Sequence, residues 1–168
     1  ALQQLLTNLA ANPGNTELFE QLTTLLTEFL DQANRMIEAG LLDQAEQMLS
    51  FIQSIDPDLR GLNIAVDYLN NLNEINELQA SLVEQALASA RELDFETATA
   101  WLLEASAVGE DQTRVEETRV EVAMFKQARA DELELKAITA MDTGNFDLAN
   151  FSIIDLIALG GKQARALS

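Results

Sequence analysis

Acidic side chains gather at two points in the second half of the chain, where paired carboxylates could act in acid–base catalysis or bind a divalent cation. The two clusters are Glu116, Glu117 and Glu121, followed by Asp131, Glu132 and Glu134. Because the chain has no histidine, the Glu-x-x-His motif of helical di-iron sites cannot form. No segment has the ligand spacing of a calcium-binding loop. The carboxylates therefore indicate solvated helix faces, and we predict no catalytic, cofactor-binding or metal-ligating residue and no cofactor.

Five polar side chains have the chemistry to bind a peptide or an acidic tail. They are Asn73, Asn76, Arg114, Arg119 and Arg129. The asparagine amides could hydrogen-bond a peptide backbone, but asparagine also competes for backbone hydrogen bonds, and the asparagine-rich run 70–73 equally predicts a break in a helix. The arginines could receive acidic side chains of a partner, or they could pair with nearby glutamates at helical spacing. The sequence leaves both alternatives open for each set.

The charge balance restricts the class of partner. The 168-residue chain carries 28 acidic and 10 basic residues, a net charge of −18 at pH 7. Such a surface repels phosphate backbones and anionic lipid headgroups, so we expect neither nucleic-acid binding nor direct membrane binding. The absence of cysteine excludes disulfides and thiolate metal sites. A hydrophobic content of 48% is sufficient for a folded domain.

One segment occurs three times and organises the chain. The copies begin at Gly40, Leu93 and Gly144, which are 53 and 51 residues apart. Each copy has a turn residue, a spacer, a large apolar residue, a carboxylate, a spacer and an alanine, followed by apolar residues three and four positions later. A fixed period of this size is typical of helical repeat arrays, in which neighbouring units bury one another.

Each position of this segment has a structural role at a turn between two helices. Gly40 and Gly144 permit the left-handed conformation that ends a helix, whereas Leu93 implies that the middle turn is built differently. The carboxylate offsets the positive end of the new helix's dipole. The large apolar residue packs back onto the helix pair, and the alanine allows the two helices to approach closely. The residues to which we assign these roles are Gly40, Asp43, Ala45, Phe95, Ala98, Gly144, Phe146 and Ala149.

Helix signals recur along the whole chain, and no segment alternates in polarity as a strand would. We predict helices over residues 1–11, 16–39, 42–55, 59–93, 95–106, 112–141 and 146–159. An interruption at 70–73 would divide the fourth, so the expected total is about seven to nine. The predicted fold class is all-α. The helices form a single domain, 1–159, with repeat units at about 16–57, 58–110 and 111–160, and 160–168 is a frayed tail or linker.

Two phrases carry a family resemblance. Residues 40–45 (Gly-Leu-Leu-Asp-Gln-Ala) and 144–149 (Gly-Asn-Phe-Asp-Leu-Ala) resemble the turn between the helices of tetratricopeptide-like repeats, and 55–57 (Ile-Asp-Pro) resembles the end of such a repeat. The resemblance implies a right-handed stack of antiparallel helix hairpins, an α-solenoid with a peptide-binding groove. The period departs from the 34 residues of that family, so long helices would replace its additional helix pair. Residues 39–45 and 55–62 also resemble repeats attached to bacterial envelope proteins such as TonB-like energy transducers.

These observations favour a non-enzymatic interaction module or scaffold that is part of a larger protein and binds a protein or peptide. One alternative is a structural helical spacer that forms a homodimer. Another is a sensor that binds a small molecule between helices near Trp101, although core packing also explains this single tryptophan. The sequence does not fix the compartment. The TonB-like resemblance implies an extracytoplasmic, periplasmic part of a membrane-anchored bacterial protein, which we prefer slightly to a cytoplasmic location.

Overall fold

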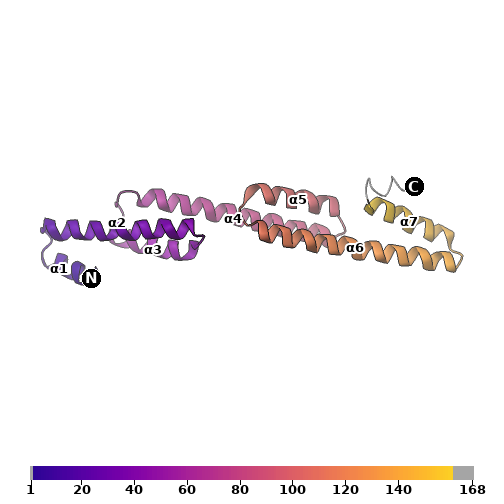
Figure 1. Cartoon of the computed structure of the whole chain (residues 1–168), viewed down its shortest axis with the longest axis horizontal. Coiled ribbons are helices and arrows are strands. Elements are labelled where there is room, and N and C mark those ends of the chain that lie inside the picture. The colour runs from indigo at the N-terminus through magenta and orange to yellow at the C-terminus, as the bar shows by residue number, and fades with distance from the viewer. Residues whose placement is uncertain (1, 161–168) are drawn as a thin grey trace. The chain divides into compact units, whose positions relative to one another are not determined.

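All regular secondary structure in residues 2–160, which the computed structural model describes, is α-helical (Figure 1). The seven helices of this range are α1 (Leu2–Ala11), α2 (Thr16–Glu38), α3 (Leu42–Ile55), α4 (Leu62–Arg91), α5 (Phe95–Val108), α6 (Gln112–Asp142) and α7 (Phe146–Gly160). They confirm the all-α prediction and are compatible with a helical repeat fold. The predicted tail lies outside the described residues, apart from Gly160, which ends α7.

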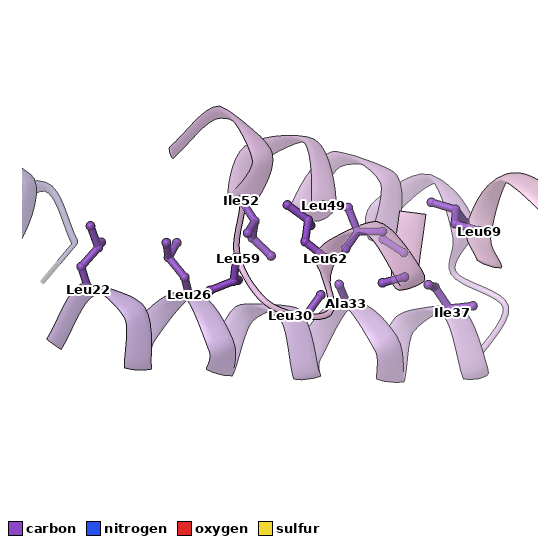
Figure 2. Close-up of a cluster of buried hydrophobic side chains, with 12 residues drawn as sticks. Leu22, Leu26, Leu30, Ala33, Ile37, Leu49, Ile52, Leu59, Leu62 and Leu69 are labelled. Carbon is purple, nitrogen blue, oxygen red and sulfur yellow. The ribbon is translucent and has the colours of Figure 1, made fainter. Parts of the chain in front are cut away.

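The first of two compact units extends to Glu74 and is built on the apolar stripe of α2. Apolar residues recur there at three-and-four spacing, which places them on one face of the helix. This face packs against α1 and α3. Figure 2 shows that the core also contains side chains from the start of α4 and the turn before it. The buried residues are Leu22, Leu26, Leu30, Ala33, Ile37, Ala45, Leu49, Ile52, Leu59, Leu62, Ala65 and Leu69.

The second unit begins at Ile75 and contains the second half of α4 with α5, α6 and α7. It has a core of its own, in which α5 packs against α6. The buried residues are Leu82, Val83, Ala86, Ala90, Phe95, Ala98, Leu102, Ala105, Val115 and Val122. Beyond this core, α7 packs along the second half of α6 through small side chains, including Ala137, Ala140, Ala149 and Ser152.

The two long helices are uninterrupted. α4 is helical through the asparagine-rich run 70–73, so the predicted break at this run was wrong. The low helix propensity of asparagine is a cost of a few tenths of a kcal/mol per residue, which the buried apolar residues on both sides outweigh. α6 is likewise one helix of 31 residues. The other predicted helix boundaries agree with the observed ones to within two residues or fewer, apart from the start of α4.

The helices are amphipathic or short rather than long and apolar. α7 is rich in isoleucine, leucine and phenylalanine but has only 15 residues, whereas a bilayer-spanning helix needs about 20. Among residues 2–160, no helix combines the length and the apolar character that crossing a membrane requires.

Candidate functional site

The three repeated turns have the same backbone structure. Gly40, Leu93 and Gly144 have φ angles of 74°, 68° and 73°, all in the left-handed region. In each turn this residue donates its N–H to the carbonyl three residues earlier, and the next residue donates to the carbonyl five residues earlier. This pair of hydrogen bonds is the Schellman motif. The expectation that the Leu93 turn is built differently was therefore wrong, and Leu93 adopts a conformation that glycine adopts at lower cost.

The start of the following helix differs among the three copies. In the second, the Asp94 side chain accepts a hydrogen bond from the backbone N–H of Thr97 at 3.1 Å. Hydrogen bonds from the Thr97 side chain and backbone lower the pKa of Asp94 below its ordinary value. In the third, Asn145 accepts from Leu148 N–H at 3.2 Å. Leu41 occupies this position in the first copy and has no side-chain cap.

The residues expected to shape the turns are placed unequally. Ala45, Ala98 and Ala149 are all buried, as close approach of two helices requires. The large apolar residue is buried in the second copy, where Phe95 is 8% exposed, but Phe146 in the third copy is 72% exposed. Phe146 therefore does not pack back onto its helix pair in the way expected for this position. Asp43 is exposed in the first turn of α3.

A third segment covers two of the three helix pairs. We call α2 with α3 the first helix pair, the second half of α4 with α5 the second, and the second half of α6 with α7 the third. The first pair shares its core with Leu62, Ala65 and Leu69 at the start of α4, which lie over it in Figure 2. The second pair is followed by Val115, Thr118 and Val122 at the start of α6, all three of which are buried. We call residues 62–69 and 115–122 the covering segments.

The third helix pair has no covering segment among the described residues. Three of its positions correspond to buried positions of the other pairs but are open, and a fourth carries a carboxylate. Ile37 and Ala90 are 4% and 0% exposed, whereas Met141 at the corresponding position is 55% exposed. The other correspondences are Leu49, Leu102 and Ile153; Ile52, Ala105 and Leu156; and Leu30, Val83 and Glu134. We call Glu134, Met141, Ile153 and Leu156 the open face.

The open face continues into other exposed apolar side chains on α6 and α7. Ile153 is 39% exposed and Leu156 is half-buried, and large apolar neighbours beside them also reach solvent. These neighbours are Leu135, Ile138, Phe146, Phe151, Ile154 and Ile157. An apolar surface of this extent on one helix pair is typical of an interaction site. The sequence held a signal for it, since α7 lacks the polar outer face that a terminal repeat usually has.

The candidate arginines form ion pairs with glutamates of the same unit. Arg129 Nη1 lies 2.7 Å from Glu132 Oε2, and the hydrogen bond and charge of Arg129 lower the pKa of Glu132. Arg119 pairs with Glu116. Arg114 instead reaches from the covering segment's helix to α4, where its Nη2 lies 3.3 Å from Glu84 Oε1. Arg114 and Arg119 are at least 46% exposed at the side chain, and Arg129 is more buried.

The candidate asparagines lie on different parts of α4, and a neighbouring glutamine proves more distinctive. Asn73 is half-buried in the first unit, and Asn76 is exposed in the second. Gln79, which sequence reasoning did not single out, is 3% exposed. Its amide donates to Ala105 O at 3.0 Å and accepts from Asp111 N–H at 3.2 Å. Gly109 leaves room for this amide, because a Cβ there would lie 2.2 Å from Gln79 Oε1.

The second unit also contains a groove of about 1040 Å³ between α5, α6 and α7. Its charged side chains are mixed in sign, with Lys126 and Arg129 opposed by acidic residues that include Asp94 and Asp155. This mixture gives the groove no clear preference for an anion or a cation. Trp101 does not line it but packs, half-buried, against the second core.

The described residues offer no group of three or more acidic side chains close enough to hold a metal ion. The predicted carboxylate clusters instead face solvent along α6. The feature that stands out is therefore the open face of the third helix pair. Comparisons of the chain with protein-family models, with curated proteins and with solved structures gave no match.

Proposed function

We propose that this chain is a helical-repeat interaction module, and that the open face of its third helix pair is where a protein or peptide binds. The function is non-enzymatic on this proposal, and the chain acts as a scaffold of tetratricopeptide-like character. The three identical turns and the shared spacing of buried residues support a repeat.

The observation that carries the proposal is a difference in burial at equivalent positions. Leu49 and Leu102 are each 2% exposed, and Ile153 is 39% exposed. The residue is apolar in all three copies, as a buried position requires, but only the third copy leaves it in contact with water. Bringing a protein segment onto this face would remove apolar surface from water, which is the main favourable term in protein association.

A structural, dimerising spacer is the alternative that the same face favours. A second copy could cover the open face, and this would spend the apolar surface on self-association. The solution mass separates the two functions. Light scattering coupled to size-exclusion chromatography is expected to give the mass of one chain across a range of protein concentrations. A stable dimer that Ile153→Ser dissociates would instead establish the spacer.

Capture of a partner tests the interaction module. The immobilised chain is incubated with extract of the organism that makes it, alongside Met141→Gln and Ile153→Ser variants. Ile64→Ser serves as the control, because Ile64 is 77% exposed on α4 and lies outside the third pair. The proposal expects a protein that the wild type and the control retain and that the open-face variants lose. Equal retention by all variants would contradict it.

A further inference from the structure

We infer that the occupant of the open face is a basic amphipathic helix of another polypeptide, with apolar residues at positions i, i+3 and i+7. This inference rests on the proposed function and specifies the partner's chemistry. It follows from three observations: the form of the two covering segments, the position of Glu134, and the charge of the third helix pair.

The two covering segments define the shape that fits a helix pair. Both belong to helices, and both bury residues with the same spacing. Leu62, Ala65 and Leu69 are 0%, 5% and 2% exposed, and Val115, Thr118 and Val122 are 0%, 5% and 6% exposed. Residues at this spacing lie on one face of a helix. Because the third pair repeats the turn and the apolar positions of the other two, a helix with the same anchor spacing fits it.

The open face differs from the other pairs at one position in a way that selects charge. Leu30 and Val83 are 5% and 1% exposed, and the corresponding residue of the third pair is the exposed Glu134. A helix that covered Glu134 with apolar side chains would bury an unpaired carboxylate, which is strongly unfavourable. A lysine or arginine near the first anchor of the covering helix would pair with it. Arg114, which directly precedes Val115 in a covering segment, already pairs with Glu84 of α4 in this way.

The surroundings of the open face are acidic as a whole. The range 131–160 carries six acidic side chains, all exposed, and one basic side chain. These are Asp131, Glu132, Glu134, Asp142, Asp147 and Asp155, with Lys136. Such a field attracts a basic helix and raises its association rate. It also opposes a second copy of this chain, whose net charge is −18. We therefore commit to a basic partner helix rather than to self-association.

Peptides derived from the chain's own covering segment provide the test. The parent probe is residues 112–126 with capped ends, which carries three basic and three acidic side chains. The basic probe has Glu116→Lys, Glu117→Lys and Glu121→Lys, all at exposed positions of the covering helix. A third probe adds Val115→Asp and Val122→Asp to the basic one. It keeps a positive charge but lacks the outer apolar anchors. Each labelled peptide is titrated with the whole chain, and binding is followed by fluorescence anisotropy.

The basic probe is expected to bind at least about tenfold more tightly than the parent at low salt, and the difference should shrink as salt screens the charges. The anchor-less probe should bind weakly, which separates docking from general attraction to an acidic protein. On the protein side, Glu134→Gln should weaken binding of the basic probe about threefold. Ile153→Ser should weaken it further, and Ile64→Ser should leave it unchanged.

Three results would overturn the inference. Equal affinity for the basic and parent probes would mean that charge does not select the partner, and the proposed function would still stand on the capture experiment. Equal binding of the anchor-less probe would mean that no helix face is recognised. The titration is repeated with any longer natural form of the polypeptide, and loss of binding there would mean that the same polypeptide supplies the covering helix.

Discussion

The first and third helix pairs share a turn, a spacing and an apolar pattern, yet one is closed and the other open. Leu49 and Ile153 occupy the same position, and their exposed fractions are 2% and 39%. Ala45 and Ala149, four residues earlier, are both buried, so the two helices of each pair approach closely in either case. The difference therefore arises from the third segment, which covers the first pair and has no counterpart on the third. The comparison teaches that a helix pair of this repeat forms on its own and that its outer face is completed by a further helix.

Truncation of the two equivalent residues should show the largest difference. Leu49→Ala is expected to lower the free energy of unfolding of the first unit by about 3 kcal/mol, because it removes buried methyl groups and leaves a cavity. Ile153→Ala should cost only about 1 kcal/mol, because its side chain already contacts water. Urea unfolding followed by circular dichroism measures both. Equal losses would show that Ile153 is covered in solution and would remove the contrast between the pairs.

The buried Gln79 offers a second comparison, since Leu26 holds the corresponding position in the first unit. Gln79→Ala should lower the free energy of unfolding by about 2 kcal/mol, because the Ala105 carbonyl and the Asp111 N–H both lose a partner. Gln85→Ala on the exposed side of the same helix is the matched control and should cost little. If the two variants were equally stable, the amide would not tie α4 to the turn before α6.

The three turns should respond alike to glycine. At positions 40, 93 and 144 the glycine variant is expected to be more stable than the alanine variant by about 1 kcal/mol, because all three residues have positive φ. Comparing glycine with alanine cancels the loss of the Leu93 side chain. The order should reverse at Ala88, an exposed residue within α4, where Ala88→Gly costs about 1 kcal/mol. A preference for alanine at position 93 would mean that its turn differs after all.

The missing cap of the first copy can be supplied. Leu41 has φ −86° and ψ 58°, and Asp94 has φ −90° and ψ 77°, so a capping side chain fits the backbone at residue 41. Leu41→Asn is expected to be more stable than Leu41→Ala by about 0.7 kcal/mol, because the amide oxygen accepts a hydrogen bond at the start of α3. Thermal unfolding of the two variants measures the difference. Equal melting temperatures would show that the turns differ at this position by more than the cap.

Sequence reasoning located the repeat and most helix boundaries because both depend on local signals. Alanine, glycine and apolar spacing act within a few residues, so they are readable without a structure. Two predictions failed for the opposite reason. Leu93 takes a glycine-like conformation, and α4 continues through residues 70–73, because the surrounding fold outweighs a local preference of about 1 kcal/mol or less.

The candidate site was less accessible from the sequence than the fold. Ile153 carries the same local signal as Leu49 and Leu102, and no pattern within the repeat reveals that its covering segment is missing. The candidates chosen for their chemistry, such as Arg119 and Arg129, pair with glutamates one helical turn away. The one readable sign was Glu134, a carboxylate at a position where the other copies have Leu30 and Val83. It became informative only when the structure showed that those two residues are buried.

The smallest expected effect concerns pH and the cap of the second copy. Hydrogen bonds from Thr97 lower the pKa of Asp94 in the folded chain. The stability that this carboxylate contributes is therefore complete above its unfolded pKa, near about 3.9, and is lost as the pH falls through the lower folded value. In an NMR titration, the Asp94 carboxyl should have its midpoint below that of an unstructured peptide of residues 92–98. Asp94→Asn keeps an oxygen that can accept the hydrogen bond but removes the titration, so its stability should fall less between pH 6 and pH 3. An unchanged pH dependence in that variant would show that the carboxylate does not favour the folded chain by its charge, and the second and third caps would then be equivalent.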